Sequence, residues 1–162
     1  MRRLNEQSLG NVALHYLRRY SATRAGLAQM LNRRVRNHAR MKKVDIPADM
    51  PTMISNVVER MVKAGYVDDQ RLAQSKSASL QRQGKSTRVI RLKLRMKGVP
   101  AELIAGATQI SAEQELEAAA VLVRKKKLGR DRERRQRDFG VLMRAGFSFD
   151  VAKRALQLTV PT

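Results

Sequence analysis

The residues of this sequence best suited to chemistry are cationic, and the densest group of them lies in the middle of the chain. No acidic residue occurs between Gln70 and Ala101, whereas Lys and Arg recur throughout that stretch. Such a row either tracks phosphates or forms a solvated helix face, and the lack of nearby acids favours phosphate binding. Within it, Arg88, Arg91 and Arg95 are spaced to share one face of a helix. The full row is Arg71, Lys76, Arg82, Lys85, Arg88, Arg91, Lys93, Arg95 and Lys97.

Two further basic clusters flank this row. The earlier cluster lies where helical periodicity fades, and we read it as a flexible phosphate-binding arm or an exposed loop. The later cluster, offset by Asp131 and Glu133, either contacts nucleic acid or an acidic protein surface, or is a solvated helix end that complements the helix dipole. The earlier cluster contains Arg33, Arg34, Arg36, Arg40, Lys42 and Lys43; the later one contains Arg124, Lys125, Lys126, Lys127, Arg130, Arg132, Arg134, Arg135 and Arg137.

Catalytic and metal chemistry has little support in the sequence. There is no Cys, and the two His residues, His15 and His38, have no neighbouring ligand set. Asp68 and Asp69 follow a helix that ends at Gly65, which favours helix capping over a metal site or an acid–base pair. No phosphate-binding glycine loop, nucleophile elbow or HExxH motif occurs. The sequence therefore predicts a protein that is not an enzyme and that uses no metal or cofactor.

Aromatic residues are few, and most of them fall on helix stripes predicted to face inward. Core packing is therefore our first interpretation, and stacking on nucleic-acid bases is the alternative. Tyr66 fits neither pattern clearly. The inward-facing residues are Tyr16, Tyr20, Phe139, Phe147 and Phe149.

Composition indicates the class of partner. The chain has 162 residues, 34 of them Lys or Arg against 14 Asp or Glu, and its formal net charge is +20. That charge exceeds what solubility requires, so nucleic acid or an assembly containing it is the first partner to consider. Hydrophobic residues make up 43%, enough for one compact domain or an array of small units. No apolar stretch approaches the ~18 residues of a membrane span, and no secretory signal is present, so we expect a cytoplasmic protein.

Helical periodicity runs through the chain, whereas strand signals are weak. Apolar residues from Leu9 to Tyr20 recur at helical spacing and form one stripe. Ser111 with Gln114 matches a capping box, and glycines stand where later helices should end. The fold is therefore predicted to be all-α. The expected helices cover about residues 9–20, 23–31, 52–64, 68–83, 86–97, 100–107, 111–128, 131–145 and 148–158.

An internal repeat is detectable in the second half of the chain. Residues 94–107 superpose without gaps on residues 142–155, a shift of 48 residues. Both copies contain a helix end, a glycine (Gly98 and Gly146) and an acid in the first turn of the next helix. Three helices of this size bury little surface alone, so we expect three-helix repeats stacked into an elongated molecule. The predicted units are residues 1–66, with a basic insertion at about 32–51, then 67–109 and 110–162.

Four segments together resemble the RecX family. They are residues 65–73 (GYVDDQRLA), 82–91 (RQGKSTRVIR), 94–98 (LRMKG) and 144–151 (RAGFSFDV). No single segment is unique to that family, but their order and spacing are fairly specific. The resemblance extends from about Leu9 to Leu158.

The resemblance implies a regulator of the RecA recombinase that lies along the helical groove of the RecA filament on single-stranded DNA. Proteins of this family limit filament growth and suppress strand exchange, ATP hydrolysis and co-protease activity, in the setting of homologous recombination and the SOS response. The implied partners are the RecA filament, single-stranded DNA and secondly double-stranded DNA, with no membrane, and the protein is expected to be a monomer. The alternative is a general DNA- or RNA-binding structural protein that acts by charge alone.

Overall fold

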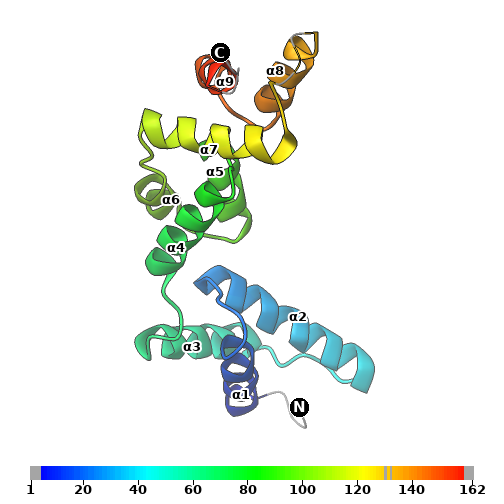
Figure 1. The fold of residues 1–162 in the computed structure, drawn as a ribbon. Coiled ribbons are helices and arrows are strands. Elements are labelled where there is room, and N and C mark those ends of the chain that lie inside the picture. Colours follow the sequence, from blue (N-terminus) through cyan, green and yellow to red (C-terminus); the bar gives the residue numbers. More distant parts are fainter. Residues whose placement is uncertain (1–4, 130, 132, 159–162) are drawn as a thin grey trace. The chain divides into compact units, whose positions relative to one another are not determined.

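The computed structural model describes residues 5–129, 131 and 133–158, and the secondary structure of these residues is helical (Figure 1). The predicted all-α fold is therefore confirmed. None of the described helices is long and apolar enough to cross a membrane. The helices are α1 (Glu6–Leu17), α2 (Arg24–Lys42), α3 (Met50–Lys63), α4 (Asp69–Arg82), α5 (Thr87–Met96), α6 (Ala101–Ala107), α7 (Ala112–Lys126), α8 (Arg135–Arg144) and α9 (Phe149–Gln157).

Contacts between residues divide the chain into two compact units. Unit 1 contains the described residues up to Leu72 together with Lys97–Val99, and it is built on α1, α2 and α3. Unit 2 contains Ala73–Met96 and the described residues from Pro100 onward, and it includes α5 to α9 and most of α4. The three-unit division that the sequence suggests stays a prediction.

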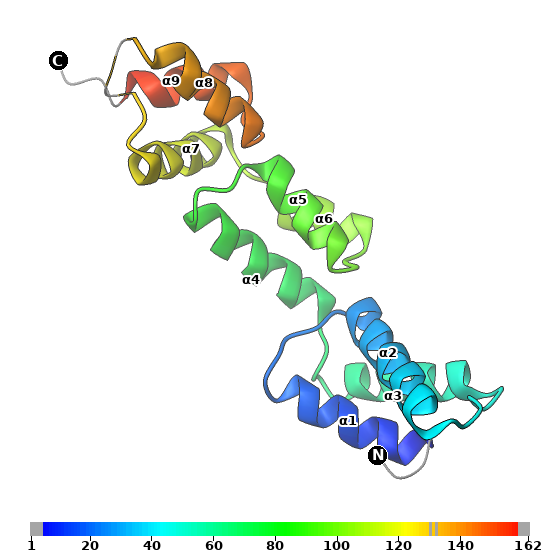
Figure 2. The same cartoon turned by 90° about the vertical axis from the view of Figure 1, so that its right-hand side faces the viewer.

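The core of unit 1 is formed by the apolar stripes of its three helices. Both α1 and α2 pack on α3 (Figure 2). The buried residues of α3 recur every one to four positions and form a broad apolar stripe. This stripe contacts both α1 and α2. The buried core residues are Leu9, Ala13, Leu27, Leu31, Val35, Met50, Ile54, Val57, Val58, Met61 and Val67.

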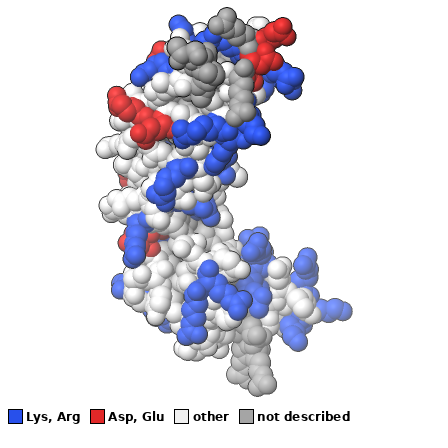
Figure 3. Space-filling view, viewed as in Figure 1, with Lys and Arg blue, Asp and Glu red and all other residues white. Residues whose placement is uncertain are grey.

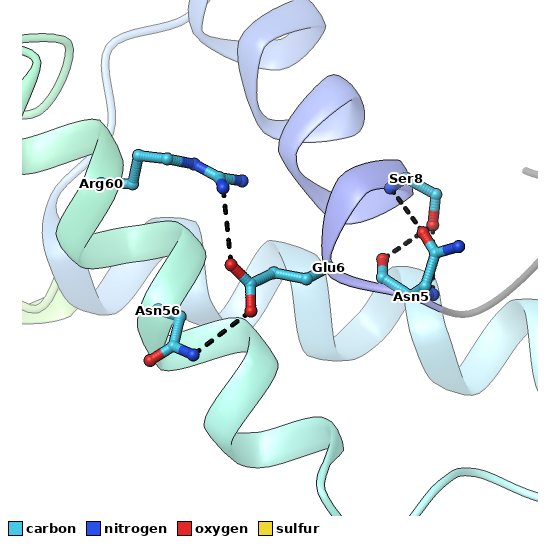
Figure 4. Close-up of polar contacts among 5 residues, drawn as sticks. All are labelled: Asn5, Glu6, Ser8, Asn56 and Arg60. Carbon is cyan, nitrogen blue, oxygen red and sulfur yellow. Dashed lines mark hydrogen bonds and ion pairs between the residues drawn. The ribbon is translucent and has the colours of Figure 1, made fainter.

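Polar contacts fix the start of α1 against α3. The Asn5 side chain accepts a hydrogen bond from the Ser8 N–H at 2.8 Å, and the Ser8 side chain accepts one from the Asn5 N–H, which completes a capping box. The next residue, Glu6, accepts hydrogen bonds from Asn56 Nδ2 at 3.2 Å and Arg60 Nη1 at 3.4 Å (Figure 4). Because the Glu6 and Arg60 side chains are still partly exposed to solvent, their ion pair orients α1 more than it stabilises it.

Helix α2 continues through the basic stretch for which the sequence suggests an arm or a loop. Leu27, Leu31, Val35 and Ala39 are four residues apart and all buried, so one apolar stripe holds the whole helix on the core. The helix ends at Lys43, whose backbone is left-handed with φ of 53° and whose N–H donates to Ala39 O. The prediction of an arm or loop at Arg33, Arg34, Arg36 and Arg40 is wrong, because these arginines occupy the solvated faces of a helix.

Several other helix boundaries differ from the predictions, among them the start of α1 at Glu6 rather than Leu9. Helix α3 begins at Met50 rather than after Pro51, since a proline in the first turn lacks only an N–H that would have no helical partner there. Helix α8 begins at Arg135, four residues later than predicted, and α1 ends at Leu17 instead of Tyr20. The predicted capping box at Ser111 and Gln114 is present and opens α7.

The core of unit 2 centres on the contact between α7 and α9, with α8 beside them. Alanines on both helices allow a close approach of the two backbones, and larger side chains fill the remaining space. Ile90, Leu94 and Ile104 bury α5 and α6 within the same unit. The core residues around α7 and α9 are Ala118, Ala119, Val123, Leu128, Leu142, Phe147, Ala152, Ala155 and Leu156.

The aromatic residues divide between the core and the surface. Phe147 is buried as predicted, and Tyr16 and Phe139 are half-buried. Tyr20 and Phe149 are exposed at 59% and 62%, so the prediction that they pack in the core is wrong. Tyr20 lies beyond the end of α1, where the helical stripe stops, and Phe149 begins α9 with its ring in an edge-to-face contact with Phe139.

A contact in unit 1 joins a helix cap to a glycine turn. The Thr23 hydroxyl accepts a hydrogen bond from the Gly26 N–H at 2.9 Å, which caps α2, and donates one to Lys97 O. The next residue in the turn, Gly98, has φ of +74°, and a Cβ there would lie 2.7 Å from the Ala25 Cβ. Only glycine fits, because both the backbone conformation and the space exclude a side chain.

Unit 2 contains the same arrangement at Ser86. Its hydroxyl accepts from the Val89 N–H at 3.4 Å and donates to Ala145 O at 2.7 Å. Gly146 has φ of +88°, and a Cβ there would lie 2.7 Å from the Ser86 hydroxyl and 3.4 Å from the Arg88 Cβ. Gly98 and Gly146 are the two glycines that the 48-residue repeat superposes.

A carboxylate completes each arrangement. In unit 1, Asp69 Oδ1 accepts a hydrogen bond from the Arg24 N–H at 2.9 Å. In unit 2, Glu115 accepts from the Thr87 N–H at 3.1 Å and also from the Thr87 hydroxyl. Each acid therefore satisfies the first free N–H of a helix, α2 or α5, that lies far from it in the sequence.

Candidate nucleic-acid interface

The arginine row of α5 lies on one side of that helix. Ile90 and Leu94 are buried, which turns Arg88, Arg91 and Arg95 toward solvent. Arg91 is held in place, because its Nε donates to the hydroxyl of Thr108 at 2.9 Å, and Thr108 in turn donates to Ile104 O at 2.7 Å. A guanidinium anchored through Nε keeps its two terminal nitrogens available to an anion.

The α5 row borders a groove of about 780 Å³ within unit 2. The opposite wall contains the N-terminal ends of α7 and α9. The one acid among its described lining residues is Glu115, which already accepts hydrogen bonds from Thr87. The lining residues are Thr87, Arg88, Arg91, Leu92, Arg95, Ile110, Ser111, Ala112, Glu115, Gly146, Ser148 and Val151.

Unit 2 also brings together two basic segments that are distant in the sequence. Lys125 Nζ at the end of α7 donates to Gln83 O at 3.0 Å. The turn after α4 can approach α7 because it contains Gly84, where a Cβ would lie 3.0 Å from Ala118 O. Residues 82–85 and 124–127 are thus adjacent, and their cations can act on one ligand.

Figure 3 shows how charge is distributed on one face. Helix α7 has acidic side chains near its N-terminal end and basic ones near its C-terminal end, and basic side chains also cover the surface at α2. This distribution of charge complements the helix dipole. It agrees with the interpretation of the later basic cluster as a solvated helix end. Exposure also leaves Arg124 to Lys127 accessible to an anionic partner.

The remaining predicted site residues lie in several places. Arg82, Lys93, Arg124, Lys126 and Arg135 are exposed, and Lys85 is half-buried. Lys127 ends α7 with a left-handed backbone, φ 55°, and Arg134 pairs with Asp131 at 3.4 Å. Lys97 belongs to unit 1, so the acid-free row does not form a single surface within unit 2. Arg130 and Arg132 lie outside the described residues.

Sequence reasoning missed two features of the surface. Leu92 and Met96 on α5 are exposed at 54% and 78% because they lie off the stripe of Ile90 and Leu94, and their positions between the arginines could have indicated this. A groove between α1 and α2 in unit 1, containing Tyr16 and Tyr20, was hidden by the assignment of both rings to the core.

The described residues contain no cluster of acids and histidines suited to a metal ion. Asp68 caps α4 by accepting from the Arg71 N–H at 2.9 Å, and Asp69 serves α2, so this pair has the capping role that the sequence favours. At the start of α7, hydrogen bonds from its own backbone and from Ser111 lower the pKa of Glu113 below its usual value of 4.5. An ionised carboxylate suits a helix N-terminus.

The fold and the surface define a strongly basic protein built of short packed helices. Residues 68–107 match the second three-helix domain of RecX. The chain is 39% identical over 164 residues to the regulatory protein RecX of Myxococcus xanthus, an alignment that covers 96% of this chain and 87% of that protein. It is 31% identical over 156 residues to the regulatory protein RecX of Agrobacterium fabrum, which covers 92% and 82% respectively. The chain therefore belongs to the RecX family.

The fold agrees with this family. A crystal structure of RecX from Lactobacillus salivarius superposes with a TM-score of 0.71 at 21% sequence identity. The superposition covers 94% of this chain and 95% of that one. At this low identity the likeness concerns the fold alone.

Proposed function

We propose that this protein is a non-enzymatic regulator that binds the RecA filament on single-stranded DNA and inhibits its recombinase, ATPase and co-protease activities. Its cytoplasmic location is part of the proposal. Two relatives that match nearly the whole chain carry the name regulatory protein RecX. The structural observation that carries the proposal is the groove of unit 2, where the three arginines of α5 are exposed and the one acid among the described lining residues is already bonded.

Inhibition by this route requires binding and no chemistry. A basic surface that contacts DNA phosphates or acidic protein groups favours whichever state of the filament exposes them. If that state cannot add subunits or complete strand exchange, the bound protein slows both. Exposed arginines suit this role, because they meet a polyanion at little desolvation cost and act over a distance of about 8 Å at physiological salt.

The alternative is a protein that coats nucleic acid through its charge alone, which the formal net charge of +20 favours. The two functions differ in whether the position of the cations matters. A coat protein loses affinity in proportion to the charge removed, wherever it is removed. A filament regulator loses inhibition only when its contact surface is changed.

Two double variants of equal charge separate these functions. Arg88→Gln with Arg95→Gln removes two charges from the groove of unit 2 and leaves the anchored Arg91 unchanged. Arg24→Gln with Arg60→Gln removes two charges from unit 1, where both arginines are paired with solvated glutamates at 3.0 and 3.4 Å. Neither pair is buried, so both double variants should fold.

The assay is DNA-dependent ATP hydrolysis and strand exchange by RecA of the same organism, with the protein added at stoichiometric amounts. We expect inhibition by the unchanged protein and by the unit 1 variant, and its loss in the α5 variant. Equal loss in both variants supports the charge-only protein. The proposal is falsified if the unchanged protein leaves both RecA activities unaltered.

A further inference from the structure

We propose that unit 1 contains a separate binding site for single-stranded DNA, in which a base stacks on Tyr20 and neighbouring arginines bind phosphates. The site is the groove between α1 and α2, and it shares no residue with the groove of unit 2. The choice of DNA as the nucleic acid rests on the proposed function. The stacking site itself rests on the groove, its two rings and its charge.

The groove has room for a nucleotide. Its volume is about 650 Å³, and it is lined by residues of α1, of the turn after α1 and of α2. Val12 and Met30 contribute apolar side chains to its lining, as a site for a flat base requires, whereas Ser8 and Asn11 contribute polar groups. Pockets for small ligands commonly have volumes of about 300–1,000 Å³.

Two neighbouring tyrosine rings line the groove. The ring centroids of Tyr16 and Tyr20 lie 5.2 Å apart with a tilt of 36° between the ring planes. Tyr16 is half-buried against the core, whereas Tyr20 is 59% exposed. The Tyr20 N–H donates to Tyr16 O at 3.0 Å, which fixes the backbone of the outer ring relative to the inner one. A base can therefore stack on the exposed Tyr20 ring while Tyr16 stays packed against the core.

The charge of the groove suits a phosphate chain. Arg19 and Arg34 line it together with His15, and none of its described lining residues is acidic. Within the part of the chain that the structure describes, neither arginine forms an ion pair with a carboxylate. Arg34 and its neighbour Arg33 are both exposed on α2 and belong to the earlier basic cluster of the sequence. Cations beside an exposed aromatic ring are the combination by which proteins bind single strands.

This geometry selects single strands over duplexes. In a duplex each base is covered on both faces by its neighbours, so a protein can meet the phosphates and the base edges, but no base face is free to stack on a ring. A single strand can rotate a base onto the exposed Tyr20 ring while its phosphates reach the arginines. Tyr20 is therefore expected to contribute to affinity for single strands and not to affinity for duplexes.

The chain contains a closely matched control. Tyr66 is 58% exposed, lies in the same unit and does not line the groove. Binding of fluorescently labelled oligo-dT is measured by anisotropy at fixed salt for Tyr20→Ala, Tyr20→Phe and Tyr66→Ala. Because base–aromatic stacking contributes ~1–3 kcal/mol, we expect Tyr20→Ala to weaken binding by about 5- to 160-fold. Tyr20→Phe keeps the ring and should retain affinity, and Tyr66→Ala should change it less than about twofold.

Tyrosine emission gives a second, independent measurement. The protein has no Trp and three Tyr, so its intrinsic fluorescence comes from these three rings. In a Tyr66→Phe variant only the two groove tyrosines emit. Oligo-dT should quench this emission after correction for absorbance, and a duplex of equal phosphate concentration should quench it less.

Three outcomes would overturn the site. They are equal loss of oligo-dT affinity in Tyr20→Ala and Tyr66→Ala, equal loss of duplex affinity in Tyr20→Ala, and unquenched emission in Tyr66→Phe at saturating oligo-dT. If Tyr20→Ala is misfolded, its circular dichroism will differ from that of the unchanged protein. Tyr20→Phe then tests the site, because it keeps the ring and must bind oligo-dT normally. These experiments contain no RecA, so they stand or fall separately from the inhibition assay.

Discussion

Thr23 in unit 1 and Ser86 in unit 2 make the same contact with different surroundings. Each hydroxyl caps a helix and donates to the carbonyl that precedes a left-handed glycine. In both units a Cβ on that glycine would lie close to the residue two positions after the hydroxyl, 2.7 Å from the Ala25 Cβ in unit 1 and 3.4 Å from the Arg88 Cβ in unit 2. In unit 2 a structural contact therefore also positions a cation of the binding groove.

The carboxylates of the two contacts differ in the same direction. Asp69 makes one hydrogen bond to α2, whereas Glu115 bonds both the backbone and the hydroxyl of Thr87. Glu115 lies in the groove and Asp69 does not. The bonds of Glu115 thus stabilise α5 and also occupy the one described acid of that groove. The two units thus share the geometry of the cap and the glycine turn. The residues around this contact differ, and in unit 2 they line the groove.

The largest effects are expected at the glycines. Gly98→Ala and Gly146→Ala combine an unfavourable left-handed backbone with an overlap at 2.7 Å, and each should lower the free energy of unfolding by about 3 kcal/mol. Gly65, φ +74°, has open space around its Cβ position, so Gly65→Ala should cost only about 1 kcal/mol. Gly106→Ala, in an exposed helix position, should stabilise by about 0.5 kcal/mol. Urea unfolding measures all four, and equal costs at Gly65 and Gly146 would show that the close approach is unimportant.

The hydroxyls should have the next largest effect. Thr23→Val and Ser86→Ala each remove a helix cap and leave a carbonyl without its donor, which should cost about 2 kcal/mol. Ser148 caps α9 but is exposed, so Ser148→Ala should cost about 1 kcal/mol. Thermal and urea unfolding test the order. A Ser148→Ala cost equal to that of Ser86→Ala would mean that the bond to Ala145 contributes nothing.

The carboxylates should distinguish the two units more finely. Glu115→Gln removes the negative charge from the acceptor of three hydrogen bonds and should lower the free energy of unfolding by about 1 kcal/mol. Asp69→Asn removes it from the acceptor of one and should lower that free energy by about half as much. Glu117→Gln, on an exposed position of α7, is the control and should be neutral. Unfolding at neutral pH measures the difference, and a larger loss for Asp69→Asn would reverse the comparison.

The smallest effect on stability, and the most specific effect on binding, is expected at Arg88. Arg88→Gln should change the free energy of unfolding by less than about 0.5 kcal/mol, because the side chain is exposed. If Arg88 meets a phosphate of single-stranded DNA, the slope of log affinity against log salt should fall by about 0.7. Arg24→Gln, which removes an ion-paired arginine, should leave that slope unchanged. Equal slopes in both variants would exclude phosphate contact by Arg88.

Local chemistry made much of the fold predictable from the sequence. Three features depend on residues a few positions apart: the turn at Gly65 that follows α3, the cap at Asp68 and the capping box of α7. The extent of α2 was harder, because its four-residue stripe is interrupted by arginines and becomes clear only when the helix is seen on its core. Tyr20 was misassigned because a periodic stripe does not reveal where the helix stops.

The candidate sites were less predictable than the helices. The charge and spacing of the α5 row were visible in the sequence, since they need only one helix. The contact of Lys125 with Gln83 O, the anchoring of Arg91 by Thr108 and the groove between α1 and α2 depend on packing between distant segments. No periodicity in a single sequence encodes such contacts.

Two helices end at a lysine whose left-handed backbone conformation would be more favourable for glycine. Lys43 and Lys127 adopt φ of 53° and 55°, a conformation in which glycine would save about 1 kcal/mol. Each lysine ends a helix inside a basic cluster. A laboratory selection for heat resistance should therefore recover Lys43→Gly and Lys127→Gly, and the sturdier proteins it yields would carry fewer of the cations on which nucleic-acid affinity depends.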